Sequence, residues 1–198
     1  IAAQSPMAFV KEKIGYAPED ILRKRPEGKL NDMLVDMLMA ACEEATGQKV
    51  DVGLLNYGGV RTEIHKGNVI LDNIMSMLPF DNYIYLVRLK GSDLKNIYET
   101  MTRYGIQLVG GVKLVFTKEN ELVSIEIGGK ALEEDKEYTL ATVDFLLDGG
   151  DHFQAAKNAL ELVGTGVLLR DGVLAQLRKM VEEKGVIEYR TDGRIAVL

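Results

Sequence analysis

An amide, two adjacent glycines and an arginine follow a single apolar run in this chain. The run, Val50–Leu55, predicts a buried strand, and the segment Asn56–Arg61 comes directly after it. Gly58 and Gly59 let the backbone take positive φ and approach a ligand closely, and the Arg61 guanidinium offers a planar set of donors to a carboxylate or phosphate. The segment is typical of an anion or nucleotide cradle, and a turn that only ends a strand is the alternative.

Two further segments carry acidic side chains, glycines or phenylalanine rings. Asp144–Phe153 follows a predicted strand and turns on paired glycines, and Leu78–Asn82 lies at the end of a predicted helix. Phe80 and Phe145, if they stand at the loop tips, can sandwich a planar ring, and stacking on a nucleobase contributes about 1–3 kcal/mol per aromatic side chain. The alternative is that each phenylalanine packs beneath its own turn.

The histidine content argues against a metal-dependent hydrolase within this chain. Two-metal hydrolysis needs a dense set of His and Asp ligands, but His65 and His152 are the only histidines, and neither lies in a pattern such as H-x-x-x-H or D-x-H. A lone histidine supplies only one of the ligands that zinc requires. The G-x-S-x-G elbow, the P-loop and G-x-G-x-x-G are also absent. The sequence therefore predicts no catalytic residue and no bound metal or other cofactor in this chain.

The composition is that of an ordinary globular protein. The 198 residues are 46% hydrophobic and 27% charged, which suits one domain with a full core. The net charge of −6 argues against nucleic acid as a partner, and no apolar run approaches the roughly 18–20 residues of a membrane span. The single cysteine, Cys42, excludes an internal disulfide and is expected to be a small core residue. The chain opens on Ile1 and not on methionine, which suggests either a processed chain, with a secretory signal removed, or a truncated one.

Hydrophobic periodicity places these segments between helices and strands. Helices are expected over 30–45, 72–78, 92–101, 153–160 and 170–184. Strands are expected over 50–55, 83–88, 106–109, 112–117, 121–127, 137–143, 186–190 and 194–197. The last two strands are predicted to face each other around Asp192-Gly193, and Gly164–Gly166 is predicted to be a turn.

The predicted elements indicate a single domain with an N-terminal arm. Residues 1–28 form the arm, with a short strand around Ile14–Ala17, and residues 29–198 form the domain. No repeat, low-complexity stretch or long linker divides it. The fold class is α+β with α/β-like character, a mixed β-sheet packed with helices.

With the three segments in this order, the chain resembles the C-terminal domain of the 5′-nucleotidase (UDP-sugar hydrolase) family. Asn56–Arg61 corresponds to the family's N-G-G-G-[IV]-R, Leu78–Asn82 to its L-P-F-G-N, and Phe145–Phe153 to its F-x-x-x-G-G-D-G-F. Weaker support comes from the paired glycines of Leu108–Val112 and from Leu162–Gly166. Together the matches extend over nearly the whole chain.

The resemblance implies a role for each matching residue. In that family this domain holds the nucleotide, while a separate N-terminal metallophosphatase domain supplies two metal ions and the hydrolytic site. Phe80 and Phe145 would clasp the base, and Asp151 would accept hydrogen bonds from the ribose hydroxyls. Asn56 would contact the base or sugar, and Arg61 would reach the phosphate.

The family also has a second phosphate-binding arginine before its first helix. Arg25 is the candidate, and Arg23 is nearly as close in the alignment. The complete predicted substrate-binding set is Arg25, Asn56, Gly58, Gly59, Arg61, Phe80, Asn82, Phe145 and Asp151.

Three positions depart from the family pattern. Tyr57, Asp81 and His152 each stand where the family has glycine. Asp81 adds negative charge near the path of a phosphate, and the larger side chains of Tyr57 and His152 are expected to narrow the pocket. A larger departure is that these 198 residues contain no counterpart of the metallophosphatase domain.

The resemblance therefore implies recognition of a nucleotide or nucleoside without hydrolysis by this chain alone. In the first hypothesis the chain is the substrate-binding half of a 5′-nucleotidase-type hydrolase. Its two-metal phosphatase domain would then lie on another chain or have been removed, and the two divalent metals would belong to that partner. The alternatives are a free-standing nucleotide-binding module with no catalytic role and a relic with a filled pocket. The family also implies a periplasmic or extracellular location.

Overall fold

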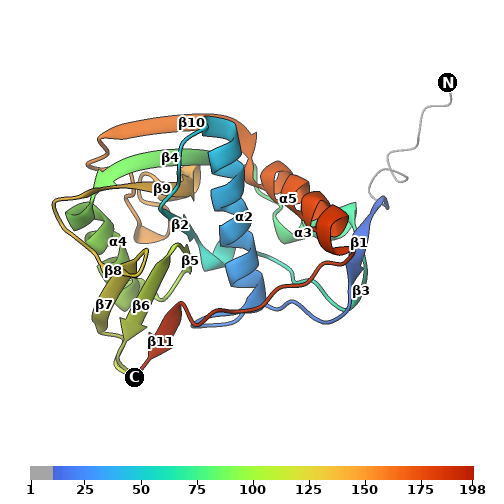
Figure 1. Ribbon diagram of the computed structural model, residues 1–198, viewed down its shortest axis with the longest axis horizontal. Coiled ribbons are helices and arrows are strands. Elements are labelled where there is room, and N and C mark those ends of the chain that lie inside the picture. The colour runs from blue at the N-terminus through green and yellow to red at the C-terminus, as the bar shows by residue number, and fades with distance from the viewer. Residues whose placement is uncertain (1–10) are drawn as a thin grey trace.

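Strands with apolar side chains on both faces form a central five-stranded sheet in the computed structural model, which describes residues 11–198 (Figure 1). In spatial order its strands are β10 (Glu161–Leu168), β4 (Tyr83–Lys90), β9 (Glu137–Val143), β2 (Val52–Leu55) and β5 (Leu108–Gly110). All four residues of β2 are buried, as a strand covered on both faces requires. The predicted α+β class, a mixed sheet packed with helices, is confirmed.

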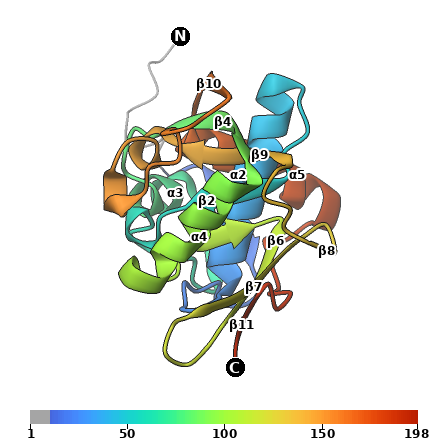
Figure 2. The same cartoon turned by 90° about the vertical axis from the view of Figure 1, so that its left-hand side faces the viewer.

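Helices cover both faces of this sheet. α2 (Lys29–Thr46) and α5 (Leu169–Lys184) pack on the face to which Ile84 of β4 points, because Gly172 of α5 lies against both Ile84 and α2. Leu89 lies five residues along the same strand and so points to the opposite face, where it lines a cavity with Ile97 of α4 (Gly91–Tyr104). Figures 1 and 2 show α2 and α4 on either side of the sheet.

Two smaller sheets flank the central one. β1 (Lys13–Ala17) pairs antiparallel with β3 (Gly67–Ile70), which leads directly into α3 (Leu71–Met77). The other sheet has the order β11 (Ile195–Val197), β6 (Val112–Phe116), β7 (Leu122–Ile127) and β8 (Lys130–Ala131). No helix within residues 11–198 has the length and apolar content needed to cross a membrane.

The expected arm is part of the same structure over its described residues. Residues 1–10 lie outside the described part of the chain. The strand expected around Ile14–Ala17 is present as β1, and Ile21 is fully buried and bonded through its backbone to Ile64. Residues 13–21 therefore contribute to the core of the domain.

The prediction of two terminal strands that face each other is wrong. Only Ile195–Val197 is a strand, and it pairs parallel with β6. Residues 186–190 form no strand, and the Ile187 N–H donates to the carbonyl of Tyr16 at 2.8 Å. The turn propensity of Asp192-Gly193 predicts a hairpin, but the long-range hydrogen bonds of the neighbouring Arg194 place the last strand beside β6 instead.

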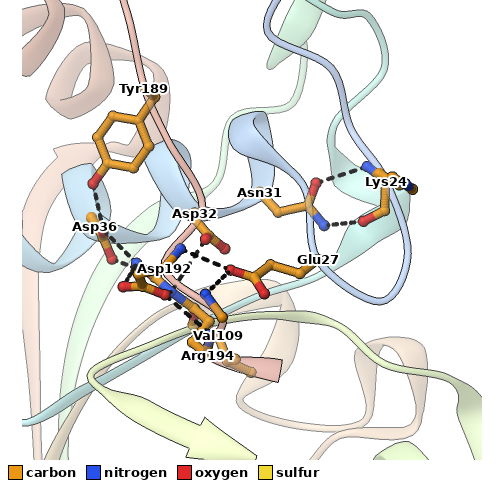
Figure 3. A network of polar contacts seen from close by, with 10 residues as sticks. Lys24, Glu27, Asn31, Asp32, Asp36, Val109, Tyr189, Asp192 and Arg194 are labelled. Carbon is orange, nitrogen blue, oxygen red and sulfur yellow. Dashed lines mark hydrogen bonds and ion pairs between the residues drawn. The ribbon is translucent and has the colours of Figure 1, made fainter. Parts of the chain in front are cut away.

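Arg194 ties the end of the chain to α2 (Figure 3). Its guanidinium forms a bidentate ion pair with Asp36 at 2.7 and 2.9 Å, bonds Asp192 at 2.9 Å, and donates to the Val109 carbonyl at 3.0 Å. The side chain is only 9% exposed, so these charge-assisted bonds are made largely out of water. They fix β11 beside β6.

Two other local predictions are also wrong. Residues 153–160 form turns and not a helix, and Gly164–Gly166 lies within strand β10. The glycine signal marks a bulge, because the register with β4 shifts between Gly164 and Leu168. The ring of Tyr85 occupies the space beside Gly164, where a Cβ would lie 3.1 Å from it.

The sheet topology brings three loops to one edge. β2 and β9 are parallel, so the loops that follow them leave from the same edge. β4 is antiparallel to β9 and pairs Ile84 with Val143, so the loop that precedes β4 arrives at that edge too. The three loops are those that the sequence singled out.

Candidate functional site

A cavity of about 320 Å³ lies where these loops meet. Its lining residues are Asn56, Gly58, Gly59, Arg61, Phe80, Asn82, Phe145 and Asp151. Eight of the nine residues predicted to bind substrate are thus brought together, and only Arg25 is outside the lining. Aromatic walls with a few polar groups are typical of small-molecule sites.

The phenylalanine rings stand at the surface of this cavity. Phe80 is 49% exposed and Phe145 is 45% exposed, although most large apolar side chains of the described chain are buried. The alternative in which each ring packs beneath its own turn is therefore wrong. Two exposed phenyl rings on the wall of one cavity suit a flat, apolar ligand surface.

The loop that carries Phe145 is held by its own first residue and by a glycine. The Asp144 carboxylate accepts the Phe145 N–H at 2.8 Å and the Tyr83 N–H at 3.2 Å, so it joins this loop to the start of β4. Gly150 lies so close to the backbone of Phe145 that a Cβ would come within 1.8 Å of the Phe145 oxygen. Only glycine allows this approach.

The orientation of the Asp151 side chain depends on an unusual backbone conformation and on a hydrogen bond from Asn56. Its φ of 49° lies in the left-handed region, which residues with a side chain rarely adopt. Asn56, which is 4% exposed, donates from Nδ2 to Asp151 Oδ2 at 3.1 Å. Within residues 11–198 the other oxygen of Asp151 makes no hydrogen bond, and the amide oxygen of Asn56 is also without a partner. The carboxylate can thus accept further hydrogen bonds at the cavity wall.

The paired glycines act differently from the prediction. Neither Gly58 nor Gly59 has positive φ, because Tyr57–Gly59 form a 3₁₀ turn. Gly59 leaves room for the Asn56 side chain, because a Cβ at Gly59 would lie 3.0 Å from Asn56 Oδ1 and would require that side chain to shift slightly. The buried Gln107 side chain supports the turn by accepting the Tyr57 N–H at 2.8 Å. Sequence reasoning missed Gln107, whose only signal is an amide within an apolar strand pattern.

Arg61 is the arginine that lines the cavity. It is exposed, and its guanidinium carbon lies 6.0 Å from the centroid of the Phe80 ring. One long contact of 3.5 Å to the Gly58 carbonyl leaves most of its donors available to a ligand. The positive charge of Arg61 and the negative charge of Asp151 are therefore both on the wall.

Arg23 and Arg25 lie beside Tyr57 instead. Their guanidinium carbons are 4.4 and 4.3 Å from the centroid of the Tyr57 ring. Arg23 also donates to the carbonyls of Tyr57 and Val60, so it is committed to holding the turn. Arg25 is exposed, and among the described residues no protein acceptor bonds its guanidinium.

Two of the three departures from the family pattern lie outside the lining of the cavity. Tyr57 lies under the arginines, and His152 stacks on Tyr104 with ring centroids 3.9 Å apart and planes 15° apart. His152 lines a different cleft, of about 720 Å³, along α4. Neither side chain belongs to the lining of the 320 Å³ cavity, so the expected narrowing is not found.

The third departure, Asp81, is paired. Its carboxylate forms an ion pair with Arg170 of α5 at 2.9 Å. The negative charge of Asp81, which was expected to oppose a phosphate, is therefore balanced by the Arg170 guanidinium, which lies outside the cavity lining. Sequence reasoning missed Arg170, which carries no local signal.

One acidic cluster in the described chain has the spacing of a metal site. Carboxylate oxygens of Glu27, Asp32 and Asp192 lie within 4.8 Å of one another. Arg194 already supplies a cation there, at 2.9 Å from Asp192 and 3.4 Å from Asp32. Burial, with a hydrogen bond that the protonated Asp32 donates to Glu27, raises the pKa of Asp32 to about 8. The arginine, together with the proton that the raised pKa favours on Asp32, thus offsets the charge of this cluster, which does not line the cavity.

Comparison with known proteins relates the chain to one family. The family model described as "5′-nucleotidase, C-terminal domain" matches residues 13–158. The chain is 26% identical over 204 residues to the "Trifunctional nucleotide phosphoesterase protein YfkN" of Bacillus subtilis, covering 93% of this chain and 14% of that protein. It is 28% identical over 185 residues to the 5′-nucleotidase of Mus musculus, covering 83% of this chain and 31% of that protein.

The fold is also found in a solved structure. The crystal structure of a 5′-nucleotidase precursor from Thermus thermophilus superposes with a TM-score of 0.85 at 24% identity, covering 97% of this chain and 40% of that one. The chain therefore spans less than half the length of each of these proteins.

Proposed function

Since the chain belongs to the family of 5′-nucleotidase C-terminal domains, we propose that its 320 Å³ cavity binds a nucleotide or nucleoside. The observation that supports this most is the convergence of three loops, distant in sequence, on one cavity with both phenylalanine rings exposed. A flat base would stack on such exposed rings, because stacking on an aromatic side chain tolerates any nucleobase.

The polar groups on the wall suit the rest of a nucleotide. The Asp151 carboxylate, oriented by Asn56, accepts hydrogen bonds from the ribose hydroxyls. Arg61 binds the phosphate, for which a planar guanidinium is well matched. Arg25, beyond Tyr57, is the second phosphate contact for a ligand with a longer charged tail.

The biological role that we propose is substrate recognition in a 5′-nucleotidase-type hydrolase. The two-metal phosphatase chemistry would come from a separate domain, on another chain or elsewhere in a longer polypeptide. The residues of this chain would hold the base and ribose and present the phosphate. A location outside the cytoplasm accompanies this proposal, because the family resemblance implies it.

Calorimetric titration of the purified protein with AMP and adenosine tests the proposal. We expect AMP to bind equally well with EDTA and with added Mg²⁺ or Mn²⁺, because no wall residue needs a metal to meet the ligand. Absence of binding to AMP, adenosine and pyrimidine nucleotides would overturn the proposal. Hydrolysis that appears only when a metallophosphatase partner is added supports the split enzyme, and its failure to appear favours a free-standing binding module.

A further inference from the structure

The loop that carries Phe80 is held from outside the cavity by the start of α5. Arg170 donates to three oxygens of this loop: Asp81 Oδ1 at 2.9 Å, the Leu78 carbonyl at 3.2 Å and the Phe80 carbonyl at 3.5 Å. The preceding residue of the helix, Leu169, donates its N–H to the Asn82 carbonyl at 2.8 Å. The first two residues of α5 therefore bond the loop at both of its ends and at Phe80 itself.

The exposed fractions of Phe80 and Arg170 indicate which contacts hold the Phe80 loop in place. The Phe80 ring is 49% exposed, so side-chain packing contributes little to its position. The Arg170 side chain is 18% exposed, whereas its partner Asp81 is 78% exposed, so solvent screens the ion pair. The bond from Arg170 to the Leu78 carbonyl is partly buried and is better shielded from water. The backbone around Phe80 is thus held by the bonds from Arg170 and Leu169 and not by packing of the ring.

We propose that Arg170 is the positioning residue for the base clasp: it holds the Phe80 loop in the conformation that presents the ring to the base. This rests on the proposed nucleotide site. It also accounts for Asp81, since an aspartate at this position gives Arg170 an ion-pair partner that glycine cannot supply. Arg170 does not line the cavity, so it acts through Phe80 and not on the ligand.

A comparison of ligands with and without a base separates this role from general stabilisation. We expect Arg170→Ala to weaken AMP binding by about 5- to 30-fold, as partial loss of one stacking face predicts. The affinity for ribose 5-phosphate, measured in competition with a labelled nucleotide, should not change. Arg170→Lys keeps the charge but loses the fork, and is expected to recover only part of the affinity.

Arg178 provides the matched control. It lies on the same helix and forms an ion pair with Glu12 at 3.0 Å, away from the loop. Arg178→Ala should leave the affinity for AMP within about twofold of the original protein, since an exposed ion pair contributes little. Asp81→Asn removes only the ion pair and leaves both carbonyl contacts, so it should cost less affinity than Arg170→Ala.

Hydrogen exchange of residues 78–82 in the unliganded protein provides a readout that needs no ligand. We expect exchange there to rise in Arg170→Ala and to stay unchanged in Arg178→Ala. If the original protein binds no nucleotide, the proposed function fails, and exchange still decides whether Arg170 holds the loop. Unchanged exchange in Arg170→Ala and Arg170→Lys, or equal losses for AMP and ribose 5-phosphate, would overturn the inference. Should Arg170→Ala not fold, Arg170→Lys and Asp81→Asn carry the same comparison.

Discussion

At the scale of single residues, the cavity wall is organised by contacts among its own members. Asn56 orients Asp151, and Gly150 admits the backbone of Phe145 at a distance that no other residue type allows. The two phenylalanine rings, by contrast, are left exposed. The polar groups are therefore already in place without a ligand, while the apolar surface of the rings gains most from binding one.

Phe145→Ala is expected to weaken AMP binding by about 1–3 kcal/mol, because one stacking face is lost. Calorimetric titration measures this. Leu162→Ala is the matched control, since Leu162 has a similar exposure of 47% but lies on β10 outside the cavity. An unchanged affinity in Phe145→Ala would remove Phe145 from the site.

His152 allows a test of strain against stacking. Its φ of 70° is costly for any side chain, and its ring stacks on Tyr104. His152→Ala keeps the strain and loses the stack, so we expect a loss of about 1–2 kcal/mol in the free energy of unfolding. His152→Gly loses both and should stay within about 1 kcal/mol of the original protein.

Urea denaturation measures both His152 variants. Repeating them in a Tyr104→Ala background provides the control, since the stacking contribution is then already absent. Equal stabilities for His152→Ala and His152→Gly would show that the backbone strain is not felt.

At the scale of elements, the site follows from strand order. Parallel β2 and β9 end at one edge and antiparallel β4 begins there, so three loops meet although Asn56 and Asp151 are 95 residues apart. A shift of one residue in this register would turn the loops' first side chains to the other face of the sheet. The glycines that follow β9 make the tight loop possible.

Gly150→Ala should displace the Phe145 loop, because the new Cβ would meet the Phe145 carbonyl at 1.8 Å and backbone cannot yield cheaply. We expect a loss of roughly 1–3 kcal/mol in stability together with loss of AMP binding. Gly149→Ala is the control: its φ is 98°, but no atom lies within 4 Å of the added Cβ. It should cost only the backbone strain of about 1 kcal/mol, and equal effects of the two variants in urea denaturation would contradict the contact argument.

At the scale of the whole molecule, ion pairs join the C-terminal segment to helix α2. Arg194 joins the segment before β11 to α2, and α2 in turn packs on the central sheet (Figure 3). Asp32 is almost fully buried beside this arginine, and its raised pKa is the consequence of that burial. We therefore expect the stability of the whole fold to depend on pH through a residue that does not line the cavity.

Stability should fall as pH rises from about 4 towards 9. The pKa of Asp32 is about 8 in the folded state and near 3.8 when unfolded, so between these values the folded state binds a proton that the unfolded chain lacks. The favourable contribution is complete below 3.8 and is lost as pH rises through 8, by about 1.4 kcal/mol per pH unit at most. Asp32→Asn, which mimics the protonated acid, should become progressively more stable than the original protein over this range in urea denaturation.

Asp192 supplies a control of opposite sign. Its pKa is lowered, chiefly by the hydrogen bond from Arg194, so its contribution is present above 3.8 and is lost as pH falls through the lower folded value. Asp192→Asn should therefore destabilise the protein at neutral pH. A constant stability difference between Asp32→Asn and the original protein from pH 4 to 9 would contradict the assignment to Asp32.

We expect no phosphatase activity from the purified chain at any concentration of divalent metal. The one group of described residues with metal-like spacing pairs with Arg194 and does not line the cavity. Release of inorganic phosphate from AMP, assayed with and without Mg²⁺ or Mn²⁺, tests this. Metal-dependent turnover that persists through repeated purification would reveal a site that neither sequence nor geometry identified.

The sequence alone determined the family, the fold class and all eight residues that line the cavity, which are eight of the nine predicted to bind substrate. These signals are local: apolar periodicity reports which elements form, and each binding loop carries its own phenylalanine, glycines or acid within a few positions. Arg61 and Asn82 were found because they lie inside such loops.

Only the tertiary structure decided which distant side chains support the loops. Arg170 and Asp81 are 89 residues apart, and Gln107 and Tyr57 are 50 apart, so no periodicity or turn preference relates them. The position of Arg25 outside the wall and the parallel pairing of β11 have the same origin. The physical reason is the size of the energies. Local propensities contribute tenths of a kcal/mol to about 1 kcal/mol per residue. Leaving a buried guanidinium without its partners costs more than that, so contacts between distant residues decide the structure where the two conflict.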